Sequence, residues 1–305
     1  TVQKSFFSIS QNMKDNMLRK IIRFIEYVFT TIRLVLKVKN TIVHFQWFLV
    51  PSFDLIIIKL LKLRNCKIFY TAHNAKPHNK TISKFQIKIY DEVDKIFVHG
   101  INIKNDIISL TNISKLKFVI IPHGNKLVDN KIKTIIPAEL NEINFKSNLV
   151  FSFLGQINKN KGVDKLLEMW SKIKLDNKNT FLLIAGKADK SLKKKLSNYD
   201  LKNCFIIDRF LSNEEFTWVL KNSNLILLPY SSGSVSGVFF SAASHKLPVL
   251  TTDFGSISDY IIDKKTSFIS NDFIDFEKKL KIFSKKSKDF FLEIGIKNYN
   301  HVSQN

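Results

Sequence analysis

Small, hydroxyl-bearing residues are concentrated between two apolar segments in the second half of the chain. The stretch PYSSGSVSGVFFSAASHKLPVLTTDFG occupies residues 229–255 and follows the apolar run NLILL. This pattern predicts a strand, a loop, a helix from about Gly237 to His245, and a second strand. The first N–H groups of a helix lack partners within the helix and carry positive partial charge. We therefore expect the amides of Ser236, Gly237 and Val238 to bind an anion such as a phosphate.

Histidines stand at or near the carboxyl ends of four strand-like segments in the first half of the chain. The segments are TIVHFQW, KIFYTAHN, KIFVHG and KFVIIPHG, and they contribute His44, His73, His99 and His123. Helical stretches such as PSFDLIIIKLLKL separate most of them, which predicts a parallel, doubly wound sheet. Ligands bind at the carboxyl ends of strands in such sheets. With His78, five of the seven histidines are expected along one edge.

The chain is predicted to contain two α/β domains. Residues 1–130 form the first, residues 131–146 lack strong periodicity and are interpreted as a linker, and residues 147–305 form the second. The second domain begins with the strand NLVFSFLG, the loop QINKNKG and the helix VDKLLEMWSKI, and it includes capping-box spacing at Ser212 and Glu215. Two such domains facing each other are expected to leave a cleft suited to a two-substrate transfer.

A formal net charge of +22 predicts attraction to nucleic acid, anionic lipid or phosphorylated substrates. The apolar segment MLRKIIRFIEYVFTTIRLVLKVK, residues 17–39, carries too many charges for a spanning helix or a signal peptide. It fits either a helix on an anionic membrane surface or a core helix with a solvated basic edge. Cys66 and Cys204 stand beside apolar residues, which favours buried thiols in a reducing, cytoplasmic compartment.

Several segments, taken in order, resemble the GT-B glycosyltransferases, specifically glycosyltransferase family 4, which includes many bacterial polysaccharide and capsule enzymes. FSFLGQINKNKGVDKLLE, FLLIAGK, NLILLPY, SGV and LPVLTTDFGSISDYI resemble the donor-binding half, and FYTAHN, IFVHG and VIIPHGN are similar to the acceptor side. The resemblance spans about Thr41 to Ile262. It implies two Rossmann-like domains and retaining, metal-independent transfer from a nucleotide sugar to a glycan or polyprenyl-linked glycan, with no further cofactor.

The resemblance also implies roles for individual residues. Gly155 and Gln156 would start the loop that meets the donor diphosphate, Lys161 would neutralise it, and His73 would lie beside the transferred sugar as the catalytic-region candidate. The other donor-side candidates are Gly162, Lys187, Arg209, Tyr230, Ser234, Ser236, Gly237 and Val238. The acceptor-side candidates are His44, Gln46, Trp47, Asn74, His78, His99 and His123. Each of these residues could instead have only a structural role. Tyr230, for example, would either border the nucleotide or fill the core.

Three departures from the family pattern support a second hypothesis. Gln156 stands where many relatives have arginine, and Gly233 and Ser241 stand where relatives have paired glutamates. No apolar first strand with a glycine-rich turn precedes residue 17, so the first domain is expected to be incomplete unless KSFFSIS is that strand. A catalytically weak GT-B-shaped subunit, acting as a membrane-associated partner of another transferase, would also fit. No metal site and no nucleic-acid partner are expected, because D-x-D, zinc-ligand and groove-reading motifs are missing from the sequence.

Overall fold

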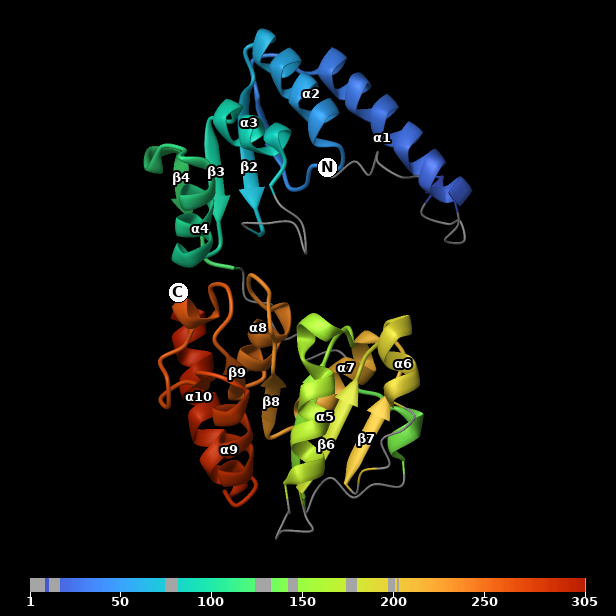
Figure 1. Cartoon of the computed structure of the whole chain (residues 1–305), viewed down its shortest axis with the longest axis vertical. Coiled ribbons are helices and arrows are strands. Elements are labelled where there is room, and N and C mark those ends of the chain that lie inside the picture. The colour runs from blue at the N-terminus through green and yellow to red at the C-terminus, as the bar shows by residue number, and fades with distance from the viewer. Residues whose placement is uncertain are drawn as a thin grey trace. The chain divides into compact units, whose positions relative to one another are not determined.

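The computed structural model describes residues 9–10, 17–74, 82–123, 133–141, 148–173, 180–196, 201 and 203–304. The chain divides into two compact units, Thr1–Ile121 (unit 1) and Pro122–Asn305 (unit 2). Figure 1 traces the helices and strands of both units along the chain.

Unit 1 contains a four-stranded parallel sheet with the order β1-β2-β3-β4. Its elements are α1 (Met17–Lys37), β1 (Ile42–Phe45), α2 (Pro51–Leu63), β2 (Lys67–Ala72), α3 (Lys84–Glu92), β3 (Lys95–Val98), α4 (Ile101–Thr111), η2 (Lys115–Lys117) and β4 (Phe118–Ile120). Each helix connects one strand to the next strand in the same direction across the sheet. Because such crossovers are right-handed, α2, α3 and α4 lie on one face of this sheet. Ile68, Ile96 and Val98 are fully buried, whereas the alternating Phe69 and Phe97 are only half-buried.

Helix α1 is attached to α2 by a buried polar contact. The Tyr27 hydroxyl donates a hydrogen bond to the carboxylate of Asp54, which also accepts the N–H of Val50. Tyr27, Thr31 and Val35 form the buried side of α1. No helix in the described parts of the chain is long and apolar enough to cross a membrane.

Unit 2 contains a six-stranded parallel sheet with the order β10-β9-β8-β5-β6-β7. Its elements are η3 (Ala138–Leu140), β5 (Leu149–Leu154), η4 (Lys159–Lys161), α5 (Val163–Lys172), β6 (Thr180–Ala185), α6 (Lys190–Leu196), β7 (Cys204–Ile207), α7 (Asn213–Asn222), β8 (Leu225–Leu228), α8 (Gly237–Ser244), β9 (Val249–Thr252), η5 (Ile257–Tyr260), β10 (Phe268–Ser270), α9 (Phe273–Phe283) and α10 (Lys288–Gln304). Every residue of β5, β8 and β9 is buried, as expected for parallel strands with both faces covered.

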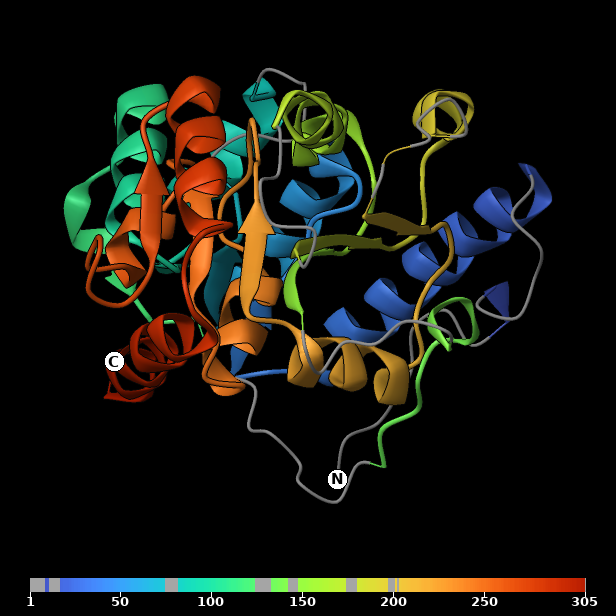
Figure 2. The ribbon, with the colours of Figure 1, turned by 90° about the horizontal axis from the view of Figure 1, so that it is seen from below.

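The strand order of unit 2 reverses at its centre. The chain runs outward from β5 through β6 to β7 and then returns to β8 on the other side of β5. Helices α5 and α9 contact each other, as do α8 and α10, and Figure 2 shows helices on both faces of this sheet. Unit 2 is therefore doubly wound, and its topological switch point lies between β5 and β8.

Local sequence signals in unit 2 are confirmed. Helix α8 begins at Gly237 and ends at Ser244, with His245 as its C-cap residue, and Ser212 and Glu215 form the expected capping box. Within the segment interpreted as a linker, Leu140 is fully buried in the core of unit 2. Residues 138–140 therefore pack as part of this unit.

Candidate active site

The loops that follow β5 and β8 flank the switch point of unit 2. The first loop runs over residues 155–162 and the second over residues 229–236; we call them the switch-point loops. Because β5 and β8 are parallel neighbours, both loops leave the same carboxyl edge of the sheet. Open α/β sheets bind ligands in the crevice at such a reversal. The loops carry most of the residues that the sequence predicted on the donor side.

Close backbone packing joins the two switch-point loops. Ser231 N–H donates to Asn160 O at 2.9 Å, and the Asn158 side chain accepts the N–H of Lys161 at 3.0 Å. Gly162 has a φ of 65°, and a Cβ atom there would lie 1.8 Å from Pro229 O. Only glycine fits this position without moving the backbone. The loops are therefore held together independently of any ligand.

Lys161 extends from the first loop onto an aromatic ring of the second. Its Nζ lies 3.6 Å from the centre of the Tyr230 ring, an arrangement typical of a cation–π contact. Burial lowers the pKa of Lys161 to about 8. Among the residues that the structure describes, no aspartate or glutamate forms an ion pair with this half-buried amine. Its positive charge therefore remains available to an anionic ligand.

The amino end of α8 presents unpaired amides beside the first loop. Ser236 is the N-cap residue, yet its side chain does not cap the helix. The N–H groups of Gly237 and Val238 donate to no acceptor in the described part of the chain. A Cβ atom at Gly155 would lie 3.8 Å from Val238 Cγ2, whereas one at Gly237 would meet nothing within 4 Å. Open space thus adjoins the free amides.

Residues in and beside the loops show how the departures from the family pattern are accommodated. Gln156 is exposed, and Ser234 O accepts the N–H of Ser256 at 2.8 Å. A Cβ atom at Gly233 would lie 3.2 Å from Phe254 Cδ2. The buried Ser241 hydroxyl donates to Gly237 O at 3.1 Å. The ring of Phe254 thus restricts side chains at position 233, and a serine hydroxyl bonded within α8 occupies position 241.

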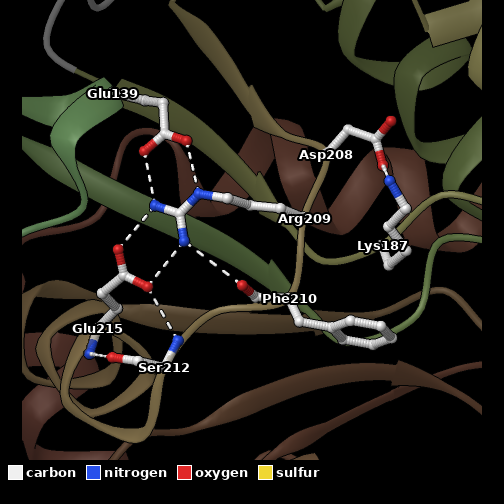
Figure 3. A network of polar contacts seen from close by, with 7 residues as sticks. All are labelled: Glu139, Lys187, Asp208, Arg209, Phe210, Ser212 and Glu215. Carbon is white, nitrogen blue, oxygen red and sulfur yellow. Dashed lines mark hydrogen bonds and ion pairs between the residues drawn. The ribbon is translucent and has the colours of Figure 1, made fainter. Parts of the chain in front are cut away.

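Two predicted donor-side cations are already paired with carboxylates. Lys187, after β6, forms an ion pair with Asp208 at 3.6 Å. Figure 3 shows Arg209, after β7, between two glutamates. Its Nε donates to Glu139 Oε1 at 2.8 Å and its Nη2 to Glu215 Oε1 at 2.7 Å, and the Arg209 hydrogen bonds hold the pKa of both carboxyls below the ordinary value. Arg209 therefore fastens η3 to the start of α7.

Four acceptor-side candidates and the catalytic candidate His73 gather at the carboxyl edge of the unit 1 sheet. His44 Nε2 lies 2.8 Å from Thr71 Oγ1 and 3.3 Å from the amide nitrogen of Gln46, and His73 Nε2 lies 3.2 Å from Gln46 Oε1. Rings also stack: Trp47 lies on His73, and the centres of the His73 and His99 rings are 5.3 Å apart. The set that the structure brings together is His44, Gln46, Trp47, His73 and His99.

The structure describes two of the other three acceptor-side candidates, Asn74 and His123. Asn74 is half-buried after His73. His123 belongs to unit 2, where its ring stacks on Phe240 of α8 at 4.5 Å and its N–H donates to the Tyr260 hydroxyl at 3.0 Å. His78 lies outside the described residues.

Sequence reasoning missed the partners of several predicted residues. Glu139, Thr71 and Phe240 were not singled out, although each contacts a predicted site residue. Asn158 offered a local signal, because asparagine commonly closes turns through its side chain. In the described ranges, no group of three or more His, Cys, Asp or Glu residues could hold a metal ion.

Comparison with known proteins identifies the family. Residues 137–289, half of the chain, match the family described as "Glycosyl transferases group 1". The chain belongs to this family. It is therefore a glycosyltransferase, and both switch-point loops lie within the matched region. No curated protein matches the chain in sequence.

Solved structures share the fold of this glycosyltransferase. HepE of Anabaena in complex with UDP has a TM-score of 0.71 at 9% identity, covering 90% of this chain and 77% of that chain. Sucrose-phosphate synthase from Thermosynechococcus elongatus has a TM-score of 0.71 at 12% identity, covering 96% and 76%. A trehalose-6-phosphate synthase, studied for glycosyl transfer with retention, has a TM-score of 0.70 at 11% identity, covering 92% and 75%. The chain has the GT-B fold with two Rossmann-like units.

Proposed function

We propose that this glycosyltransferase takes a sugar from a nucleoside-diphosphate sugar and binds the donor diphosphate at the switch-point loops. The observation that carries the proposal is a lysine without a carboxylate partner near two free helix N-terminal amides. Lys161 supplies the cation, and Gly237 and Val238 supply the amides. The similar HepE structure contains UDP, which supports a nucleotide in this fold.

The chemistry requires stabilisation of negative charge. In the proposed transfer, the bond between the sugar's anomeric carbon and the diphosphate oxygen breaks, and the acceptor oxygen forms a bond to that carbon. The proton of the acceptor hydroxyl passes to the departing diphosphate. The Lys161 ammonium and the α8 amides stabilise the charge that develops on this leaving group. Retention of configuration and independence from metal are part of the proposal, and the retaining relative supports the former.

We propose a glycan or polyprenyl-linked glycan acceptor, placed by the cluster of His44, Gln46, Trp47, His73 and His99, in surface polysaccharide synthesis of the family 4 type. An aromatic face with adjacent hydrogen-bonding groups suits a sugar, because sugars present both apolar C–H faces and hydroxyls. Trp47 is 61% exposed beside His73, so its ring is accessible to such a ligand. His73 is the candidate for contact with the reacting sugar.

We propose that α1 rests on an anionic membrane surface, where a lipid-linked acceptor would be found. Large apolar side chains 45–68% exposed follow one face of the helix: Leu18, Ile21, Ile25, Phe29, Ile32 and Leu36. Five basic residues accompany them: Arg19, Lys20, Arg23, Arg33 and Lys37.

Replacing Ile25 and Phe29 with glutamate should abolish co-sedimentation with phosphatidylglycerol vesicles. Ile274→Glu, at an equally exposed position of α9, should leave it intact; equal binding by all three proteins would refute the proposal.

The donor site is tested by thermal unfolding with UDP, GDP and ADP. A ligand that binds only the folded chain raises the midpoint, so one of the three nucleotides should raise it more than the others. Lys161→Ala should remove that rise. Gly237→Ala should also remove it, because the added methyl group enters the open space beside the free amides.

Lys172→Ala provides the matched control, because this exposed lysine ends α5 at the opposite edge of the sheet. Its response to nucleotide should equal that of the unmodified chain. If no nucleotide shifts the midpoint, or if all three variants respond alike, the donor site is not at these loops. Such a result would instead favour a non-catalytic GT-B-shaped partner of another transferase.

A further inference from the structure

Tyr230 connects the two groups that the proposed donor site requires. It stands two residues after the end of β8 and is only 2% exposed. Its ring packs against Phe254, with centres 4.8 Å apart, and edge-on to Phe153 at 6.4 Å. Aromatic neighbours within this range restrict the ring's orientation. Tyr230 is therefore a fixed part of the core, and its side chain makes two further contacts, with Lys161 and with Ser236.

The first contact is between the ring face and Lys161. The ammonium lies 3.6 Å from the ring centre, and no described carboxylate pairs with it. A half-buried ammonium needs a favourable partner, and the negative face of an aromatic ring provides one without neutralising the charge. The N–H bonds that point away from the ring stay available to a second, anionic partner.

The second contact is between the Tyr230 hydroxyl and Ser236. The two oxygens are 3.3 Å apart and both are buried. Burial raises the pKa of Tyr230 to about 12, so the phenol stays protonated at neutral pH. Serine is among the preferred N-cap residues because its hydroxyl accepts an N–H of the first helical turn. Here the Ser236 side chain is turned to Tyr230 and makes no such bond.

We propose that Tyr230 is a positioning residue for the donor diphosphate, holding Lys161 with its ring and Ser236 away from the α8 amides with its hydroxyl. The inference rests on the proposed function. Without the ring, Lys161 loses its partner in the unliganded chain. Without the hydroxyl, Ser236 is free to cap α8 and competes with the phosphate for the same N–H groups.

The hydroxyl is tested by a double-mutant cycle on nucleotide affinity, measured by calorimetry with the nucleotide chosen in the thermal series. Tyr230→Phe keeps the ring and should weaken binding about three- to tenfold. The same change made in a Ser236→Ala background should have no effect, because the competing hydroxyl is already removed. An equal loss in both backgrounds, or no loss in either, would overturn this half of the inference.

The ring is tested without any nucleotide, so this result is independent of the proposed function. The pKa of Lys161 can be followed by NMR of carbon-13-labelled lysine, with its signal assigned by Lys161→Arg. Tyr230→Leu should lower it further below about 8, because the ammonium loses the ring, and Tyr230→Phe should leave it unchanged. An unchanged value in Tyr230→Leu, or a matching fall in Tyr230→Phe, would refute the ring's role. If the unmodified chain binds no nucleotide, the proposed donor site fails and with it the role of Tyr230 in donor binding, whereas the contact between the ring and Lys161 is still decided by the NMR measurement.

Discussion

The Trp47 ring lies nearly parallel to the His73 ring, with centres 4.5 Å apart and planes inclined by 14°. Gln46 holds the same histidine from its edge, because Gln46 Oε1 lies 3.2 Å from His73 Nε2. A carbonyl oxygen only accepts hydrogen bonds, so this contact favours the form of His73 that carries a proton on Nε2. Two neighbouring residues of the chain thus restrict the plane and favour one tautomer of the candidate catalytic side chain.

The tautomer argument predicts the effect of Gln46→Leu. Removing the acceptor should let the neutral His73 ring populate both tautomers, which nitrogen-15 chemical shifts distinguish. Trp47→Phe keeps Gln46 and should leave the tautomer unchanged. If Gln46→Leu gives the same shifts as the unmodified chain, Gln46 does not orient the proton.

The lowered pKa of Lys161 predicts a pH dependence of nucleotide affinity. The charged amine is the binding form, so affinity should be constant well below pH 8 and fall as pH rises through about 8, by up to about tenfold per pH unit. Calorimetric titrations between pH 6.5 and pH 9.5 measure this directly. In Lys161→Arg the guanidinium keeps its charge, so its profile should be flat over the same range. A parallel decline in both proteins would exclude Lys161 as the titrating group.

His44 predicts a dependence of stability on pH. Burial lowers its pKa from the ordinary 6.5, so the unfolded chain takes up a proton before the folded chain does as the pH falls. The contribution of neutral His44 is therefore complete above pH 6.5 and is lost as the pH falls through the lowered value. The thermal midpoint should drop less between pH 7.5 and pH 5.5 in His44→Gln than in the unmodified chain. An equal fall of the thermal midpoint in both proteins would show that His44 does not cause this loss of stability.

The contact of Arg209 with Glu139 predicts a measurable coupling energy. Two parallel hydrogen bonds join them, and Glu215 anchors the same guanidinium. A cycle with Glu139→Gln and Arg209→Gln should give a coupling of about 1 kcal/mol at pH 7, the upper range for partly exposed pairs. Because the pKa of Glu139 is held below the ordinary 4.5, the coupling is present above that value and lost as the pH falls through the lowered pKa. A coupling that stays the same once Glu139 has been protonated would rule out its ionic origin.

Two glycines of the switch-point loops predict opposite responses to the same substitution. Gly162→Ala places a methyl group against Pro229 O in a left-handed backbone conformation, so it should destabilise unit 2 by about 2 kcal/mol or more. Gly237→Ala enters open space at the start of α8, so the unfolding free energy should be nearly unchanged. Chemical denaturation of both variants provides the comparison. A tolerated change at position 162 would mean that the loops separate readily.

Local patterns in the sequence predicted the elements that position the site, and distant pairings escaped prediction. The start of α8 and the capping box at Ser212 depend on residues within a few positions of each other, so they could be identified. Arg209 contacts a carboxylate 70 positions away, and nothing in the spacing shows which cations are already paired. Lys161 and Tyr230 were both singled out, yet their contact depends on how two loops of adjacent strands pack.

The two candidate sets differ in the kind of atoms that they offer a ligand. In unit 2 the set relies on main-chain amides, glycine conformations and one lysine, whereas in unit 1 it consists of aromatic, imidazole and amide side chains. Almost any amino-acid substitution keeps the main-chain amide, whereas a single codon change replaces a side chain. Over evolution, we expect such a chain to keep its donor and to diversify its acceptor. Efforts to redirect the enzyme toward new products should accordingly begin at the strand ends of unit 1.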